Sequence, residues 1–357
     1  MKLRHRVPII KAVGDNCNLR CSYCFYNGKD QKTAAKMSDD LLESFLSQYF
    51  ALFSGELRFV WHGGEPLLAG IGFYERALEL QQKFAKQGDI VENLIQTNAT
   101  LITDEWADFF KRSDFRVGIS LDGTKQRHDS QRLNAGGGGS FDRVMSGLAI
   151  LRKHGITPGV IQTVLRSGVG TLSDDFHFFV KELRINGWAL NLFMDGSSRS
   201  SELVGEGLRD EDVANIYATL IDEWLKASDS KLCVREIENI VAGALHRRAT
   251  NCSFNGTCAN YFCLDAQGRV WPCDRFSSDE KFMLGDINKT SLLDVIEGEL
   301  SAKHAIRATQ LANDCVDCRW CSACNNGCTA MRSETDNKYV YCAARQKAFR
   351  AVEALLQ

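Results

Sequence analysis

The sequence of 357 residues lacks any apolar run of the roughly 18 residues that a membrane span requires. Its N-terminus, MKLRHRVPIIKAVGDN, lacks the continuous apolar core of a secretory signal. No charge of one sign dominates, because 43 Lys and Arg residues against 45 Asp and Glu residues give a net charge of -2. A general nucleic-acid-binding surface is usually strongly basic. We therefore expect a cytoplasmic protein that binds neither nucleic acid nor membranes.

Cysteine is absent between Cys24 and Cys233, although the chain has 14 cysteines. Three of them lie within residues 17–24, and ten fall between Cys252 and Cys342. A disulfide framework is typical of short secreted chains, and this chain is neither short nor equipped for export. Two separated clusters with tight internal spacing instead predict metal or iron–sulfur sites.

Strand-like and helix-like segments alternate from residue 7 to about residue 195. The amphipathic helix-like segments cover 39–50, 74–87, 103–112 and 141–155, and the strand-like runs cover 7–13, 57–64, 91–98, 115–123, 157–165 and 188–196. This alternation is typical of βαβ units around a parallel sheet. Six strands are fewer than the eight of a complete barrel. The sequence therefore predicts an α/β fold with a partial, TIM-like (β/α)6 barrel whose active face lies at the C-terminal strand ends.

The chain is expected to divide into four segments. The barrel would occupy 1–195, a Gly/Ser-rich linker and bridging helices 196–249, a small cysteine-rich iron–sulfur domain 250–345, and the end of a C-terminal helix 346–357. Within the second segment, helices are expected around 209–227 and 234–247. The third segment is dense in Cys, Gly, Asn and Asp and cannot build a large apolar core, so we expect bound metal to organise it.

The stretch CNLRCSYC supplies three thiols, Cys17, Cys21 and Cys24, but no fourth. A closed structural zinc site needs four ligands, whereas a reactive site keeps one position open. Thiolates are the usual ligands of iron–sulfur clusters, and three of them can hold a four-iron cube and leave one iron open. The stretch resembles the signature of the radical S-adenosylmethionine superfamily, which has this spacing and an aromatic residue, here Tyr23, before the third cysteine.

The resemblance implies that S-adenosylmethionine chelates the open iron and is cleaved to a 5′-deoxyadenosyl radical. It extends to HGGEP, where Gly63, Gly64 and Glu65 match the family's motif for the methionine amino group. Two glycines let the backbone approach a ligand closely, and a carboxylate pairs with an ammonium. The resemblance also implies further cofactor-binding residues, for which a surface arginine or plain core packing are the alternatives: Asn98, Ser120, Asp122, Arg132 and Leu190.

The C-terminal cysteines resemble the twin-cluster extension called SPASM, so the resemblance spans nearly the whole chain. By motif position it assigns four ligands to a first auxiliary cluster, Cys252, Cys258, Cys273 and Cys328. It assigns four more to a second, Cys315, Cys318, Cys324 and Cys342. The remaining Cys233, Cys263 and Cys321 are expected to be buried free thiols. With the first motif, this implies S-adenosylmethionine and three four-iron four-sulfur clusters as cofactors; zinc at the four-thiolate sites is the alternative.

Two subgroups of such enzymes fit the remaining motifs. WHGGEPLLAG, VGISLDG and HDSQR look more like the enzymes that crosslink side chains in ribosomally synthesised precursor peptides, including those that form cyclophanes. We favour this interpretation from the sequence. The partners would be a precursor peptide and a reductant such as flavodoxin or ferredoxin.

The alternative is an anaerobic sulfatase-maturing enzyme, which oxidises a Cys or Ser of a sulfatase to formylglycine. In its favour are QTNATLI, CSYCFY with Tyr26, and Asp274 directly after Cys273, where a carboxylate would be the general base. His62 stands against it, because that group usually has glutamine there; Tyr26 and His62 are candidate substrate-binding residues. An electron-transfer module without catalysis is a remote alternative, which the Gly-Gly-Glu motif disfavours because a carrier needs no cofactor pocket.

Overall fold

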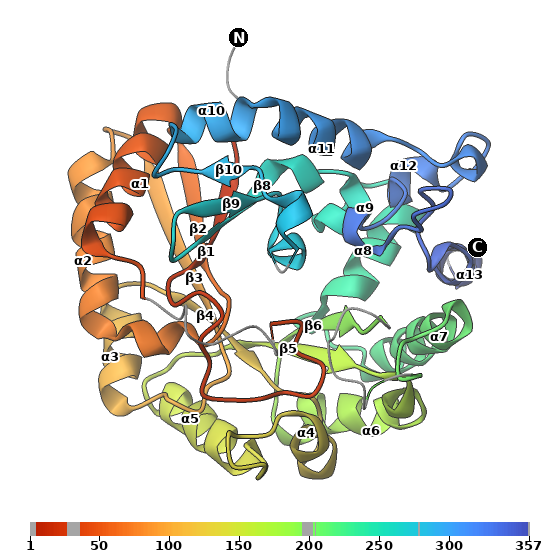
Figure 1. Cartoon of the computed structure of the whole chain (residues 1–357). Coiled ribbons are helices and arrows are strands. Elements are labelled where there is room, and N and C mark those ends of the chain that lie inside the picture. The colour runs from red at the N-terminus through yellow and green to blue at the C-terminus, as the bar shows by residue number, and fades with distance from the viewer. Residues whose placement is uncertain (1–4, 27–35, 195–202, 204, 278, 356–357) are drawn as a thin grey trace.

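One curved sheet organises the computed structural model, which describes residues 5–26, 36–194, 203, 205–277 and 279–355. Its ten strands follow the order β10-β9-β8-β1-β2-β3-β4-β5-β6-β7. Figure 1 shows the strands lining the inside of a ring and the helices covering its outside. The sheet is open, since β10 and β7 remain as its two edges.

The first six strands confirm the predicted partial barrel, because each pairs in parallel with the next. The strands are β1 (Val7–Lys11), β2 (Glu56–Trp61), β3 (Ile90–Thr97), β4 (Arg116–Ser120), β5 (Gly159–Val164) and β6 (Gly187–Leu192). The connecting helices are α1 (Asp39–Leu52), α2 (Ile71–Phe84), α3 (Asp104–Arg112), α4 (Lys125–Gln131), α5 (Phe141–Lys153) and α6 (Leu172–His177).

Side-chain alternation explains how these strands face two environments. In β2 the buried residues Leu57, Phe59 and Trp61 alternate with the more exposed Arg58 and Val60. Successive side chains of a strand point to opposite faces, so the apolar set packs under the helices and the other set lines the barrel lumen. The active face is therefore built from the second set and from the loops that follow the strands.

The cysteine-rich segment completes the sheet on the other side of β1. Strand β8 (Tyr261–Asp265) pairs in parallel with β1, and β9 (Arg269–Trp271) and β10 (Gly285–Asp286) follow in antiparallel order. Phe262, Leu264 and Val270 belong to the same apolar core as the barrel. The segment does not build a large core of its own, as expected, because its strands and helix α10 (Leu292–Glu297) join the barrel's core instead. Helix α11 (Glu299–Thr309) follows α10.

Three helices close the far side of the ring, α7 (Asp210–Ala227), α8 (Arg235–Ala244) and α13 (Cys342–Leu355), together with the short strand β7 (Cys233–Val234). The two helices expected between 209 and 247 are confirmed, although α8 ends at Ala244. Most of the expected linker lies outside the described residues. The division of the chain at 195, 249 and 345 stays a prediction, and residue 345 falls inside α13.

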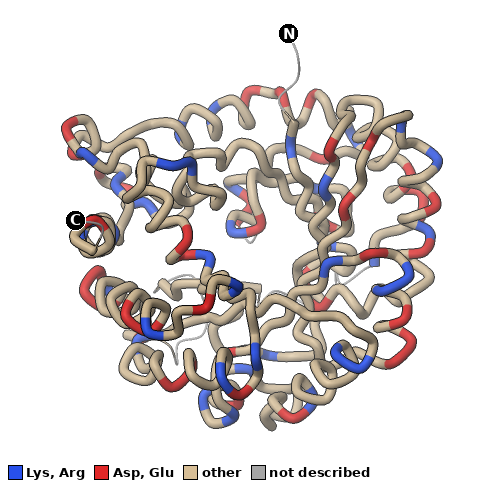
Figure 2. The backbone as a smooth tube through the Cα atoms, turned by 180° about the vertical axis from the view of Figure 1, so that it is seen from behind, with Lys and Arg blue, Asp and Glu red and all other residues tan. Residues whose placement is uncertain are grey.

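Charged residues of both signs intermix along the outer helices, as Figure 2 shows from behind. Among the described helices, none combines the length and the apolar character needed to cross a bilayer.

Candidate active site

The three thiols of CNLRCSYC lie on the loop that follows β1, at the C-terminal end of the sheet. Cys21 is buried, and Cys17 and Cys24 are half-buried. Two N–H groups donate to Cys17 Sγ, the backbone of Leu19 at 3.4 Å and Asn98 Nδ2 at 3.7 Å. Burial raises the pKa of Cys17 and of Cys21 to about 12. Because a coordinated thiol loses its proton and N–H donors tune cluster sulfurs, these residues fit an iron–sulfur cluster.

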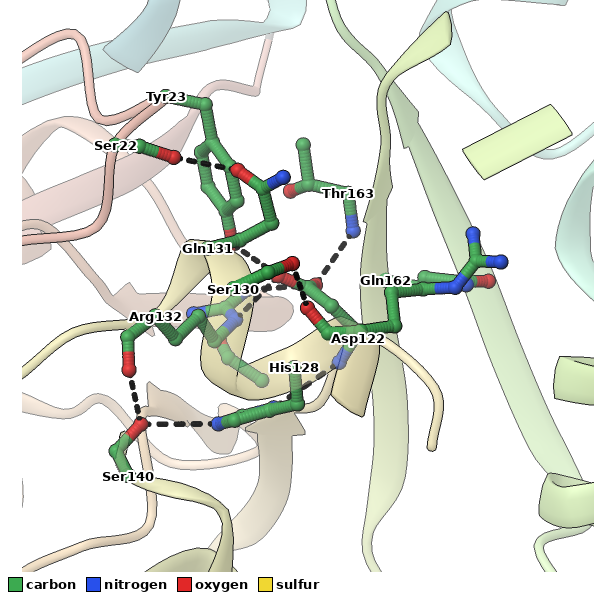
Figure 3. A network of polar contacts seen from close by, with 12 residues as sticks. Ser22, Tyr23, Asp122, His128, Ser130, Gln131, Arg132, Ser140, Gln162 and Thr163 are labelled. Atoms are coloured by element: carbon green, nitrogen blue, oxygen red, sulfur yellow. Dashed lines mark hydrogen bonds and ion pairs between the residues drawn. The ribbon is translucent and has the colours of Figure 1, made fainter. Parts of the chain in front are cut away.

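The end of α4 supports this loop, a contact that the sequence did not predict. The backbone N–H groups of Arg20 and Ser22 donate to the carbonyls of Leu133 and Gln131, at 2.7 and 2.9 Å. The Ser22 hydroxyl also donates to Gln131 Oε1 at 2.5 Å, as Figure 3 shows. The loop geometry therefore depends on residues far from the cysteine motif.

The Gly-Gly-Glu turn after β2 packs directly against the cysteine loop. Gly63 and Gly64 have φ angles of 90° and 52°. A Cβ at Gly64 would lie 2.1 Å from the Asn16 carbonyl oxygen, and one at Gly63 would lie 2.5 Å from Lys11 Cγ. The turn requires glycine because only glycine combines a positive φ with this close approach.

Glu65 is engaged with the protein rather than with the lumen. Its carboxylate is 0% exposed and accepts hydrogen bonds from Thr97 Oγ1, the Asn98 N–H and the Leu67 N–H at 2.7, 2.7 and 3.0 Å. Burial raises the pKa of Glu65, and these three donors act against that rise. The predicted pairing of its side chain with a cofactor ammonium stays a prediction. The half-buried backbone of Gly64 is the part of the turn that remains accessible.

Asp122 and Arg132 form a buried bidentate ion pair at the end of β4, drawn in Figure 3. Arg132 Nε and Nη2 donate to the two carboxylate oxygens at 2.8 and 3.2 Å. The Tyr23 hydroxyl and the Thr163 N–H also donate to the Asp122 carboxylate, at 2.6 and 2.9 Å. Arg132 is thus not a surface residue. Its contact with the methionine carboxylate stays a prediction. The ion pair with Asp122 uses Nε and Nη2 of Arg132, so Nη1 is the nitrogen that such a contact would use.

His128, as a neutral imidazole, contacts the backbone of this ion pair directly at Asp122 and through Ser140 at Arg132. Its Nδ1 accepts from the Asp122 N–H at 3.3 Å. The Ser140 hydroxyl donates to the Arg132 carbonyl at 2.6 Å, so it accepts from His128 Nε2–H at 3.0 Å. Burial, reinforced by the nearby Arg132 charge, lowers the pKa of His128 to about 4.

Acidification should therefore destabilise the fold through His128. The unfolded imidazole binds a proton near its ordinary pKa of 6.5, whereas the folded one does so only near about 4. As the pH falls through this window the unfolded state binds the extra proton, and the free energy of unfolding decreases by up to about 3 kcal/mol. Urea unfolding at several pH values measures this loss. The variant His128→Gln should lose that part of the pH dependence, and an unchanged dependence would refute the assignment.

The other three predicted cofactor-binding residues differ in placement. Ser120 is half-buried on the lumen side of β4 and accepts from Gln96 Nε2 at 3.1 Å. Asn98 is buried and donates to Cys17, so it supports the cysteine loop. Leu190 is 3% exposed and belongs to the core, whereas its neighbours on β6 are half-buried. Core packing, the alternative for Leu190, is therefore what the structure shows, because alternation turns its side chain away from the lumen.

The four predicted ligands of the first auxiliary cluster lie on short elements of the cysteine-rich segment. Cys252 begins α9 (Cys252–Asn255) and Cys258 begins η6 (Cys258–Asn260). Cys273 directly precedes η7 (Asp274–Phe276), and Cys328 directly precedes η10 (Thr329–Met331). Burial, with the neighbouring thiol Cys328, raises the pKa of Cys252 to about 11 and that of Cys258 to about 12. Burial raises the pKa of the half-buried Cys273, as do the neighbouring thiols of Cys258 and Cys252. All four side chains therefore share one electrostatic environment.

The predicted ligands of the second auxiliary cluster also form a group. Burial raises the pKa of Cys342, as do the nearby thiols of Cys324, Cys315 and Cys318. On α13, Gln346 Nε2 lies 3.7 Å from the sulfur atoms of both Cys318 and Cys342. The buried Arg345 donates to Cys324 Sγ at 3.5 Å. N–H donors thus face this group of thiols as they face Cys17.

Thiol spacing argues against zinc at these sites. Within the described residues, no three His, Cys, Asp or Glu side chains are spaced to hold a single metal ion. A tetrahedral zinc ion needs its sulfur ligands at about 2.3 Å. The thiols of the described residues therefore do not form a preset site for a single zinc ion.

The three remaining cysteines are not alike. No cysteine of the chain forms a disulfide, and all of them lie in the described residues. Cys263 on β8 is fully buried, as expected. Cys233 is half-buried and donates to Glu238 Oε2 at 2.8 Å. Cys321 is half-buried beside the second auxiliary group, because helix α12 (Cys321–Cys324) carries it there. The expectation of a buried thiol is wrong for Cys233 and Cys321.

Asp274, at the start of η7, meets Tyr26 and His62 at the barrel mouth. The Tyr26 hydroxyl donates to Asp274 Oδ1, and His62 Nδ1 lies 3.3 Å from Oδ2. Burial acts to raise the pKa of Asp274, but His62, Lys11 and Tyr26 together hold it well below the ordinary range of a carboxyl group. The structure thus brings three predicted site residues together around one ionised carboxylate.

Lys11 is a site residue that the sequence analysis missed. It is 2% exposed at the end of β1, its ammonium lies 3.9 Å from the Tyr26 ring centroid, and it forms an ion pair with Asp15. It also donates to Ser277 Oγ at 3.1 Å. A single lysine inside the apolar run VPIIKAV was the available signal, since a buried lysine needs partners.

Two family models match the chain. The model described as the radical SAM superfamily matches residues 12–171. The model described as an iron–sulfur cluster-binding domain, named SPASM, matches residues 252–325. The first range contains Cys17, Cys21 and Cys24, and the second contains the auxiliary thiols except Cys328 and Cys342.

Relatives similar to the chain over most of its length carry one activity in their names. A serine-type anaerobic sulfatase-maturating enzyme of Bacteroides thetaiotaomicron is 32% identical over 346 residues, which covers 91% of this chain and 82% of the relative. A cysteine-type anaerobic sulfatase-maturating enzyme of Clostridium novyi is 30% identical over 326 residues, 90% of this chain and 87% of the relative. The structure of native anSMEcpe with bound AdoMet has a TM-score of 0.88 at 25% identity, covering 98% of both chains.

Proposed function

This chain belongs to the radical S-adenosylmethionine enzymes with a SPASM domain, in the family of the anaerobic sulfatase-maturating enzymes, and we propose that it oxidises a cysteine or serine of a sulfatase to formylglycine. Its cofactors are S-adenosylmethionine and iron–sulfur clusters. Three groups of thiols match the three clusters predicted from the sequence. Flavodoxin or ferredoxin is the proposed electron donor.

The comparisons support this function better than the peptide crosslinking that the sequence motifs favoured. Relatives that are 32% and 30% identical over most of the chain are sulfatase-maturating enzymes. The motifs that favoured crosslinking lie in the turn after β2, in β4 and the turn after it, and at the end of α4. Gly63 and Gly64 of these motifs pack against the cysteine loop and its neighbour Lys11, and Asp122 pairs with Arg132, so these four residues report on the scaffold more than on the substrate. His62, in the first motif, lies beside Asp274 instead.

The observation that carries the proposal is the Asp274 group, which is the ionised carboxylate of Asp274 with Tyr26 and His62 beside it at the barrel mouth. Asp274 directly follows Cys273 in the chain. When bound, the cofactors would take one hydrogen atom and one electron from the substrate. To form a carbon–sulfur or carbon–oxygen double bond, the substrate's thiol or hydroxyl must also lose a proton. Serine then yields the aldehyde directly, and cysteine yields a thioaldehyde that water converts to the aldehyde and hydrogen sulfide. The Asp274 group provides the negative charge that this proton loss requires.

Peptides that copy the target segment of a sulfatase test the proposal. We expect the anaerobically purified and reduced enzyme, given S-adenosylmethionine, to convert the cysteine or the serine peptide into an aldehyde that a hydrazide reagent captures. A peptide with alanine at the target position should remain unchanged. Loss of hydrogen from the peptide without a carbonyl group would instead support crosslinking and refute this function.

A further inference from the structure

Lys11 is a buried cation at the barrel mouth to which the proposed reaction assigns no role. It ends β1, and its side chain is 2% exposed. The stem of the side chain packs against the turn after β2, where a Cβ at Gly63 would lie 2.5 Å from Lys11 Cγ and 2.9 Å from Cε. Glycine at this position therefore leaves the room that the lysine stem occupies. A buried lysine needs partners for its charge, and two partners of Lys11 also contact Asp274.

The first of these partners is Ser277, which ends the turn that Asp274 begins. Lys11 Nζ donates to Ser277 Oγ at 3.1 Å, and Ser277 Oγ donates to the Asp274 carbonyl at 2.8 Å. The directions are fixed, because an ammonium is only a donor and a hydroxyl has a single hydrogen. The Ser277 N–H donates to the same carbonyl at 3.0 Å. Lys11 thus anchors the backbone of η7 to the end of β1, although the two residues are 266 positions apart.

The second partner is Tyr26, which contacts the side chain of Asp274. Lys11 Nζ lies 3.9 Å from the centroid of the Tyr26 ring. A cation over the face of an aromatic ring is attracted to it, and the attraction is stronger where water is excluded. The ring is 8% exposed, and its hydroxyl donates to Asp274 Oδ1. The ammonium therefore holds in place the ring that orients the carboxylate.

We propose that Lys11 is a positioning residue that fixes the Asp274 carboxylate at the barrel mouth, through Ser277 on the backbone and through Tyr26 on Oδ1. This inference rests on the proposed function, in which the Asp274 group provides the negative charge for proton loss. Lys11 does not meet the substrate itself, because its side chain is almost fully buried. A carboxylate fixed at both its backbone and its Oδ1 faces the substrate's proton in one orientation, which proton transfer requires.

The variant Lys11→Met tests the proposal, because methionine keeps the apolar stem and removes the ammonium. We expect the kcat of aldehyde formation to fall on the order of 10²-fold, the usual cost of misplacing a reacting group by about 1 Å. The KM for the sulfatase peptide, S-adenosylmethionine cleavage and the iron content should stay unchanged. The matched control is Lys83→Met on α2, whose ammonium lies 4.9 Å from the Phe84 ring centroid and 2.6 Å from Glu43, and which should change none of these readouts.

A double-mutant cycle separates positioning from a merely structural role. In a protein that already carries Asp274→Asn, Lys11→Met should lower aldehyde formation no further, because the charge that it positions is gone. Ser277→Ala repeats the test with the loss of a single hydroxyl, so a folding defect of Lys11→Met cannot hide the outcome. Its effect should also vanish in the Asp274→Asn protein. Losses that multiply in these double variants would overturn the inference.

A further readout does not depend on turnover. The N–H groups of Phe276 and Ser277 donate to carbonyls of the same turn, each at 3.0 Å. Hydrogen exchange of the holoenzyme, followed by mass spectrometry of the peptide that spans η7, should show faster exchange in Lys11→Met and not in Lys83→Met. Unchanged exchange, or a normal kcat of Lys11→Met, would overturn the inference alone. Faster exchange in Lys11→Met together with no aldehyde from the wild type would overturn the proposed function and support the anchoring of η7 by Lys11.

Discussion

Replacing Cys17, Cys21 and Cys24 together by alanine should abolish S-adenosylmethionine cleavage while most iron stays bound to the C-terminal thiols. The three residues lie on one loop at the barrel mouth, and the other two groups of thiols lie on the elements from α9 to α13. Loss of the loop thiols therefore removes one cluster site and leaves two. Chromatographic detection of 5′-deoxyadenosine and an iron assay on the same sample measure both effects.

Cys233→Ala is the matched control, because Cys233 is a half-buried thiol outside all three groups. It should leave cleavage and iron content unchanged. Loss of all iron from the triple variant, or cleavage that continues unimpaired, would contradict the division into a barrel cluster and auxiliary clusters.

Asp274→Asn should uncouple cofactor cleavage from product formation. The change removes the charge that both Tyr26 and His62 face, but it keeps the shape of the side chain. Hydrogen abstraction does not need this charge, so 5′-deoxyadenosine should still form. Aldehyde formation should fall on the order of 10²–10⁴-fold, because the substrate's proton then has no oriented acceptor. Quantification of both products in one reaction measures the uncoupling.

Iron content distinguishes this effect from structural damage, since Asp274 is next to the predicted ligand Cys273. An Asp274→Asn protein with full iron content and normal aldehyde formation would refute the role of the carboxylate. Loss of iron from the variant would favour a structural role beside the cluster instead.

The barrel could be predicted from the sequence because its strands and helices carry strong local periodicity. Strand β8 (Tyr261–Asp265) could not be predicted in this way, because it is short and contains Cys263. Its partner strand β1 also lies at the other end of the chain. Only the pairing of these distant segments places Phe262 and Leu264 in the barrel's core. Local composition carries no information on such a pairing.

In the candidate site, too, the local sequence did not predict contacts between residues that are far apart in the chain. Motif resemblance selected Tyr26, His62 and Asp274 separately, but their contact joins residues 248 positions apart. The same resemblance predicts that Glu65 and Asp122 contact a ligand, which stays a prediction, but it did not indicate that both are fully buried and hydrogen-bonded to the protein. A motif identifies which residues share a site, and the direction of each side chain depends on packing that the motif does not encode.

Deuterium on the reacting carbon of the sulfatase peptide tests the proposed oxidation most directly. Abstraction at this carbon predicts that deuterium appears in 5′-deoxyadenosine and that the same peptide molecules carry an aldehyde. If deuterium stays in the peptide while S-adenosylmethionine is cleaved, the radical does not act on this carbon. If deuterium is transferred but no aldehyde forms, the chain performs a different oxidation, and formylglycine formation is refuted.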